Sequence, residues 1–251
     1  MLTTDLSRPE ALATLSLWRR LDRLYLLSAD PSANLRRLAA INSALPDHER
    51  QRIPLIVRID DPWQATAWRA KHFGGTDTRW AADAVGKYEV TARRLLDSIT
   101  AERVERLLVC GSSALTLALC ADLAQRRLER DYHAAEGTTP LPPRLVLVAE
   151  NADEYRRDHE HNLRQSGVSP DRVTVDVVTE KPSVAMLFLA LVERGDPAAT
   201  ALILVDAPTL DPTTATRLAA RLPATSIWSW DRLPKDRTTA PHWSANFARS
   251  G

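Results

Sequence analysis

The chain is poor in several residue types, and each shortage excludes a class of protein. Its 251 residues include only two cysteines, and Lys plus Arg (33) nearly cancel Asp plus Glu (32). A chain with almost no net charge has no field to hold a polyanion, so nucleic acid is not an expected partner. Cys110 and Cys120 are expected to be small, buried residues of a reduced cytoplasmic protein, without a metal or redox role.

Long hydrophobic runs are also missing. The longest uninterrupted apolar run, residues 184–192, falls well short of the ~20 residues that span a bilayer. The N-terminal sequence MLTTDLSRPE lacks a basic region followed by an apolar stretch. We therefore expect neither a membrane segment nor a secretory signal within this sequence.

The residues that are present, 44% of them hydrophobic, predict a parallel α/β fold. Short apolar runs alternate with helical patterns, which is typical of a sheet covered by helices on both faces. We predict two strands in residues 1–100, five strands in residues 101–233, and a polar C-terminal tail over residues 234–251. The prediction is thus a partial Rossmann-like unit followed by a complete, doubly wound one. The predicted strands cover residues 24–27, 53–57, 107–110, 145–149, 173–178, 201–205 and 226–230.

One further element is predicted in the first part. Apolar residues recur at helical spacing between Trp80 and Ile99, which indicates one long amphipathic helix.

The turn Gly111-Ser112-Ser113 is the strongest candidate for a ligand site. It joins the apolar run 107–110 to a helical pattern, and such a turn points backbone N–H groups and the positive end of a helix at a ligand, which suits a phosphate. However, the turn keeps only the first glycine of the G-x-G-x-x-G dinucleotide motif. The predicted site is either a nucleotide pocket or an empty Rossmann-shaped scaffold.

Two acidic residues extend this candidate site. Glu150 follows the strand 145–149, where the Rossmann pattern places the acid that binds a ribose. Asp206 follows the strand 201–205 and is assigned to the same group of nucleotide-binding residues.

The first part of the chain resembles a known family. The run TTDLSRPEALATLSLWRRLDRLYLLSADPSANLRRLAAI, followed by IPLIVRIDDPWQATAWRAKHFGG, resembles the second half of TrkA-type nucleotide-binding domains, the RCK (regulator of potassium conductance) domains. In that family an Asp ends the fourth strand, an Asn lies early in the next helix, and an Arg leaves the fifth strand before Asp-Pro. The matching residues are Asp30, Asn34 and Arg58.

The resemblance implies a non-enzymatic regulatory module that binds NAD(H) or another adenine nucleotide. It also implies a homodimer or larger ring, and control of an attached effector or of a membrane channel portion outside this chain. The glycine-rich first turn of the family is not found before the matching region, so either an upstream part is missing or the first unit does not bind nucleotide in the way of the family. As a regulatory module, the chain is expected to use Asp30, Asn34 and Arg58 in one crevice and Ser112, Ser113 and Glu150 in another.

Catalytic and metal-binding patterns are weak. The sequence contains no G-x-S-x-G or Walker motif, and no catalytic group is predicted. His159-Glu160-His161 does not suit a metal, because residues i and i+2 of a helix point in different directions, and a solvated helix face is expected instead. Two alternatives remain open, namely an NAD(P)-dependent oxidoreductase that uses the second unit and a structural module that oligomerises through the helix at Trp80–Ile99.

Overall fold

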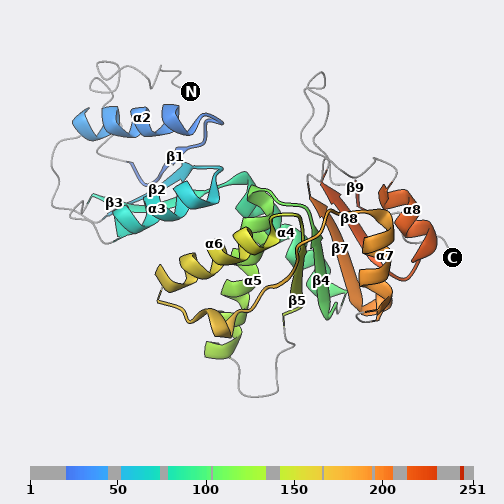
Figure 1. Ribbon diagram of the computed structural model, residues 1–251. Coiled ribbons are helices and arrows are strands. Elements are labelled where there is room, and N and C mark those ends of the chain that lie inside the picture. Colours follow the sequence, from blue (N-terminus) through green and yellow to red (C-terminus); the bar gives the residue numbers. More distant parts are fainter. Residues whose placement is uncertain are drawn as a thin grey trace. The chain divides into compact units, whose positions relative to one another are not determined.

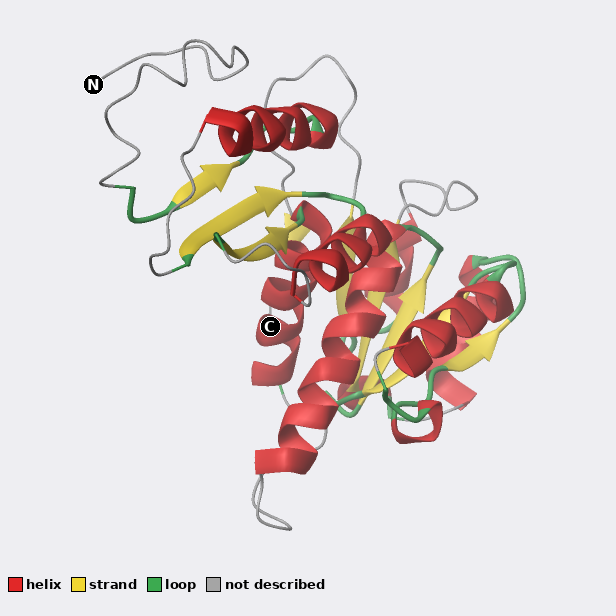
Figure 2. Ribbon diagram, turned by 90° about the vertical axis from the view of Figure 1, so that its left-hand side faces the viewer, coloured by secondary structure: helices red, strands yellow, loops and turns green. Residues whose placement is uncertain are grey.

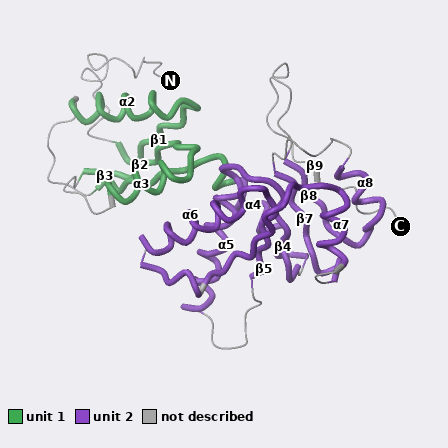
Figure 3. Tube along the Cα trace, viewed as in Figure 1, with its two compact units in different colours: residues 1–90 green, residues 91–251 purple. Residues whose placement is uncertain are grey.

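A computed structural model describes most of the chain. The described residues are 21–44, 52–73, 79–102, 104–133, 142–165, 167–193, 196–205, 214–230 and 244–245. The chain divides into two compact units, unit 1 (Met1–Val90) and unit 2 (Thr91–Gly251) (Figure 3). The division between Val90 and Thr91 falls near the start of the helix α4 (Lys87–Ala101), which begins in unit 1 and continues into unit 2.

Unit 1 is built from three parallel strands in the order β1-β2-β3. Its two βαβ connections begin with capped helices. Asp30 accepts a hydrogen bond from Ser32 N–H (2.9 Å) at the start of α2, and Asp61 accepts one from Gln64 N–H (2.8 Å) at the start of α3. An Asp before a Pro is well suited to this position, because Pro has no N–H to lose in the first helical turn. The elements are β1 (Leu24–Leu26), α2 (Pro31–Ala44), β2 (Ile53–Arg58), α3 (Pro62–Phe73) and β3 (Trp80–Val85).

The core of unit 1 lies on one face of its sheet. Figure 2 shows α2 lying alongside the strands, and residues of both helices, such as Leu38 and Trp68, share one buried cluster with alternate strand residues, such as Leu55. The intervening residues form the opposite face, where Tyr25, Ile56 and Asp83 are register partners on β1, β2 and β3. Tyr25 on that face is half exposed, and the described helices α2 and α3 both pack on the other face.

The strand β3 corrects the prediction of one long helix over Trp80–Ile99. Trp80–Val85 is a strand, and the helix α4 (Lys87–Ala101) begins only after Gly86. The described part of residues 1–100 therefore contains three strands, where two were predicted. The prediction of a helix was wrong because alanine is compatible with both the helical period and the two-residue period of a strand. The observed burial alternates from Trp80 to Ala84, as in a strand with one buried face.

Unit 2 is a doubly wound sheet in the order β6-β5-β4-β7-β8, with the two-residue β9 added antiparallel to β8. The five parallel strands confirm the five that were predicted, although β6 is shorter and follows a 3₁₀ turn at Pro170–Arg172. Its elements are β4 (Arg106–Cys110), α5 (Ala114–His133), β5 (Arg144–Val148), α6 (Ala152–Gln165), β6 (Asp176–Val178), α7 (Val184–Glu193), β7 (Thr200–Val205), α8 (Thr214–Arg221), β8 (Ser226–Trp230) and β9 (Ser244–Ala245). The rest of the predicted tail lies outside the described residues.

Helices cover both faces of the unit 2 sheet. Figure 1 shows α7 and α8 on one side of the strands and α5 and α6 on the other. Leu108 and Leu202 pack with α7 and α8 in one buried cluster, while their neighbours Leu107 and Ile203 are also fully buried. Strands buried on both faces explain the near-continuous apolar runs in the sequence. None of the described helices is both long enough and apolar enough to cross a membrane.

Candidate functional site

The turn between β4 and α5 has the geometry expected of a ligand-facing turn. Gly111 adopts φ 107°, a left-handed conformation that favours glycine, and its N–H donates to Val148 O of the neighbouring strand β5 (2.9 Å). Because β4 pairs with β5 on one side and β7 on the other, the turn lies where the strand order reverses. Ligands of open α/β sheets bind at such a switch point.

Side chains of the turn satisfy part of its backbone. Ser113 Oγ accepts from Leu115 N–H (3.1 Å), and Thr116 Oγ1 accepts from Ser113 N–H (3.2 Å) while donating to Gly111 O (3.1 Å). This is a reciprocal helix cap, and it takes two donors away from any anion. Thr116 was not predicted as a site residue, although the Ser-x-x-Thr spacing from Ser113 is typical of such a cap.

Two donors of the turn remain available. Among the described residues, the N–H groups of Ser112 and Ala114 have no protein partner. Ser112 lies beside Tyr155, at the start of α6, and its hydroxyl acts to lower the pKa of the phenol. Burial raises the pKa of Tyr155 and the charges of Glu154 and Asp158 add to the increase, which outweighs the opposing effect of Ser112. Tyr155 is a site residue that sequence reasoning missed.

The acidic residue predicted for the ribose lies at the same edge of the sheet. Glu150 is the second residue after the end of β5 and is exposed to solvent. Further along, Asp153 accepts from Thr179 Oγ1 (2.9 Å) beyond β6 and pairs with Arg156 (2.9 Å). The carboxyl ends of β4, β5 and β6 are thereby joined into one polar rim. Asp206, predicted for the same site, lies outside the described residues.

Asn34 of unit 1 is a structural residue. It is fully buried, and its amide accepts from Ser28 N–H (3.0 Å) and donates to Ser28 O (2.8 Å) and Arg58 O (3.1 Å). Both of its N–H groups are therefore committed to the backbone that follows β1 and ends β2. Asp30, the third predicted residue, caps α2. The structure brings Asn34 and Arg58 together, but the contact is made by the main-chain oxygen of Arg58 and not by its side chain.

The side chain of Arg58 serves a local charge cluster. It donates to both carboxylate oxygens of Asp60 (3.0 and 2.9 Å), which also accepts from Lys87 N–H (3.0 Å). The hydrogen bond to Asp60 raises the pKa of Arg58. Burial by itself would raise the pKa of Asp60, but the bonds from Arg58 and Lys87 outweigh it and leave that pKa below its ordinary range. The cluster ties the ends of β2 and β3 together.

Three further titratable side chains, those of His159, Cys110 and Cys120, are buried in unit 2. His161 is exposed, but His159 is only 5% exposed and its Nε2 has no hydrogen-bond partner, so the predicted solvated face is wrong for His159. Burial lowers the pKa of His159 and raises the pKa of the Cys110 and Cys120 thiols to about 12. The two cysteines are buried and free, as predicted, and no cluster of metal-binding side chains occurs in the described part of the chain.

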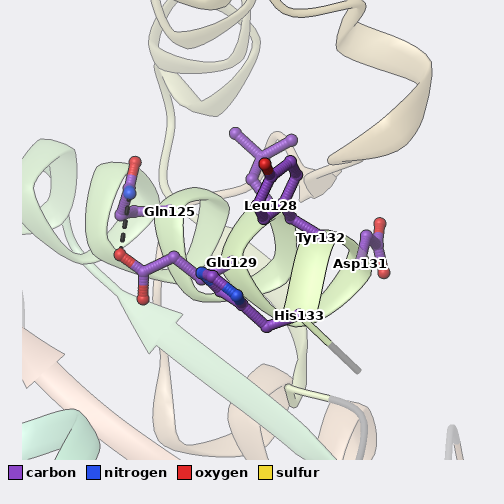
Figure 4. Close-up of a pocket in the computed structure, with 6 residues that line it drawn as sticks. All are labelled: Gln125, Leu128, Glu129, Asp131, Tyr132 and His133. Atoms are coloured by element: carbon purple, nitrogen blue, oxygen red, sulfur yellow. Dashed lines mark hydrogen bonds between the residues drawn. The ribbon is translucent and has the colours of Figure 1, made fainter. Parts of the chain in front are cut away.

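A separate hollow lies at the far end of α5 (Figure 4). It measures about 440 Å³, and all of its described lining comes from this one helix, including the hydrogen-bonded pair Gln125 and Glu129 (2.8 Å). A helix rises ~1.5 Å per residue, so Tyr132 and His133 at this end are ~30 Å from the Gly111 turn. The hollow is therefore distinct from the candidate ligand site.

Comparison of the chain with models of known protein families, with curated proteins and with solved structures finds no match.

Proposed function

We propose that the protein is a non-enzymatic regulatory module of the RCK/TrkA type that senses a nucleotide or another adenine-containing ligand. Unit 2 binds the ligand at the carboxyl edge of β4 and β5, and the resulting change is passed on to an attached effector or ion channel. The observation that carries the proposal is the left-handed Gly111 turn at the switch point of a doubly wound sheet.

The groups around the turn support a small ligand with both a phosphate and hydroxyls. The N–H groups of Ser112 and Ala114 stand at the positive end of the 20-residue helix α5, which favours an anion. Hydroxyls of Ser112 and Tyr155 lie beside these donors, and the exposed carboxylate of Glu150 can accept from a ribose.

The titration of the nearby groups favours a sensor over the alternative oxidoreductase. A proton donor for hydride transfer needs a pKa near the working pH. The pKa of Tyr155 is instead raised by burial and by neighbouring carboxylates, which moves it away from the working pH and makes the phenol a weaker acid. The Cys110 thiol, with its pKa raised to about 12 by burial, is equally unsuited to nucleophilic chemistry.

Calorimetric titration with NAD, NADH, ATP, ADP and cyclic AMP tests the proposal. We expect at least one of them to bind, and Ser112→Asp to weaken that binding more than about tenfold, because a carboxylate beside the turn repels the phosphate. Ser98→Asp is the matched control, since Ser98 is exposed near the end of α4 and away from the carboxyl edge. The absence of heat with all five ligands would contradict the proposal.

An NADH turnover assay distinguishes the sensor from the oxidoreductase. The variant Glu150→Ala tests the ribose contact, because under either function it should lower the affinity for a ribose-containing ligand. Only the oxidoreductase also consumes NADH when candidate carbonyl substrates are added, which absorbance at the nicotinamide band reports. Steady binding without turnover is the expected result.

A further inference from the structure

His159 is a buried titratable residue whose ring lacks one partner. It lies on α6 and is 5% exposed, and its Nε2 has no hydrogen-bond partner among the described residues. A neutral imidazole tolerates one unpaired nitrogen, because it carries no charge to solvate. An imidazolium has two N–H donors and a positive charge, and burying both without acceptors is costly. The surroundings of His159 therefore suit the neutral ring.

The position of His159 on α6 connects it to the candidate ligand site. Residues four positions apart lie on the same side of a helix, so Tyr155, His159 and Leu163 form one row along α6. At one end of the row, Tyr155 lies beside Ser112 of the ligand-facing turn. At the other end, Leu163 packs in a buried cluster with Ala124 of α5. His159 therefore lies between the residue that reaches the turn and the residue that anchors the helix.

Few buried side chains hold α6 in place. Its buried residues are Ala152, His159 and Leu163, whereas α5 buries seven residues between Leu115 and Ala124. An element with few buried contacts opens locally at a lower cost than the whole domain. His159 is the middle one of the three, so a change in its charge acts on a helix that is weakly held.

The charges around His159 do not compensate a proton on its ring. Burial lowers its pKa, and the smaller opposing effect comes from Glu160, which pairs with Arg164 (3.3 Å). The Cys120 thiol of α5 is uncharged, because burial raises its pKa to about 12. The charged groups of the neighbouring elements are Arg127 on the Ala124 side of α5, the exposed Asp171 of the 3₁₀ turn, and Asp176 of β6, which pairs with Arg144 (2.6 Å). His159 therefore takes up a proton only as the pH falls below about 6.5, the ordinary histidine pKa.

We propose that His159 is a proton switch that controls the candidate ligand site through Tyr155. When its ring takes up a proton, the imidazolium moves out to water, and the N-terminal half of α6 leaves its place against α5. Tyr155, in the same row, then parts from Ser112 and from the free N–H donors of the turn. Acid thereby weakens ligand binding. This last step rests on the proposed function, whereas the movement of Tyr155 needs no ligand.

Fluorine NMR of the full chain labelled with 3-fluorotyrosine tests the movement without a ligand. The chain contains four tyrosines, and Tyr155→Phe identifies the signal of Tyr155. We expect this signal to shift between pH 7.5 and pH 5.0 along the titration curve of one proton, and His159→Gln to abolish the shift. His161→Gln is the matched control and should keep it, since His161 is exposed on the same helix. His159→Leu is a second uncharged variant in case His159→Gln does not fold.

Calorimetry at pH 7.5 and 5.5 measures the consequence for binding. The probes are NAD, NADH, ATP, ADP and cyclic AMP. We expect binding to the wild type to weaken at least about threefold at the lower pH, since one coupled proton changes an affinity by at most about tenfold per pH unit. The ratio between the wild type and His159→Gln cancels any titration of the nucleotide itself, and His159→Gln should lose less affinity than the wild type.

The two measurements separate this proposal from the proposed function. A Tyr155 signal that stays in place down to pH 5.0, or that shifts equally in His159→Gln, would overturn the proton switch whether or not a nucleotide binds. An equal loss of affinity in the wild type and His159→Gln would overturn it as well. The absence of heat with all five nucleotides contradicts the proposed function alone, and the fluorine signal of Tyr155 still decides whether His159 moves α6.

Discussion

Unit 1 and unit 2 are built from the same βα repeat but differ in how their sheets are covered. In unit 1, α2 and α3 share one core on one face of three strands, and Tyr25 on the other face is half exposed. In unit 2, five parallel strands carry buried residues on both faces, such as Leu107 and Leu108. Purely parallel sheets normally have both faces covered. Unit 2 therefore has the cover that a doubly wound domain requires, whereas the described helices of unit 1 cover only one face of its sheet.

Removing a core side chain from the middle strand of each unit is the strongest test of this comparison. Leu55 on β2 and Leu108 on β4 are both 1% exposed, so Leu→Ala should cost about 3 kcal/mol at either site. Because the units are separate, we expect Leu55→Ala to raise amide hydrogen exchange only in unit 1, and Leu108→Ala only in unit 2. Exchange rising throughout the chain in either variant would show instead that the two units unfold as one.

The sequence predicts the architecture of unit 2 better than that of unit 1, for a physical reason. Strands covered on both faces read as continuous apolar runs, as in Leu107–Cys110, and are easily recognised. The strand β3, with the sequence WAADAV, is buried on one face only and consists mainly of alanine. Its small residues fit a helix as well as a strand, so its pattern merged with that of α4.

The residues of the candidate sites also differ in how far the sequence reveals their roles. The turn at Gly111 can be predicted from the sequence because the glycine separates an apolar strand pattern from a helical pattern. The structure places this turn at the switch point of the sheet. The contribution of Tyr155 depends on α6 lying beside the turn, which no local pattern encodes. Asn34 matched a family position by sequence, yet its three hydrogen bonds to backbone groups show a structural role that only the packing around it reveals.

Substitution of Gly86 should weaken unit 1 by an intermediate amount. A Cβ atom at this position would lie 2.6 Å from the main-chain oxygen of Ile59 and 3.3 Å from Asp60, so the backbones after β2 and β3 would have to separate. We expect Gly86→Ala to cost about 2 kcal/mol through this overpacking. Hydrogen exchange in unit 1, together with the urea midpoint, measures the loss.

Gly167→Ala in unit 2 is the control for the substitution at Gly86. Gly167 adopts φ +75°, with nothing within 4 Å of an added Cβ, so the only cost is the left-handed conformation, about 1 kcal/mol. A smaller loss for Gly86→Ala than for Gly167→Ala would mean that the two chain segments of unit 1 can move apart freely.

The smallest expected effect concerns how the two units respond to acid. Burial lowers the pKa of His159 in unit 2 below the ordinary value of about 6.5, so the unfolded chain binds the proton more readily than the folded one. Its contribution to stability is complete above about pH 6.5 and is lost as the pH falls below that value, by at most about 1.4 kcal/mol per pH unit. In unit 1 the pKa of Asp60 is lowered, and the corresponding loss begins only when the pH falls below about 3.9.

Urea unfolding at pH 7.5 and 5.5, with exchange measured for each unit, checks this difference. We expect acidification to weaken unit 2 and to leave unit 1 nearly unchanged, and His159→Gln to remove most of the pH dependence because glutamine carries no titrating proton. His161→Gln, two residues away on the exposed side of α6, should retain the wild-type dependence. If both histidine variants respond to pH like the wild type, then His159 exchanges its proton without disturbing the packing of α6, and the acid sensitivity of unit 2 has another origin.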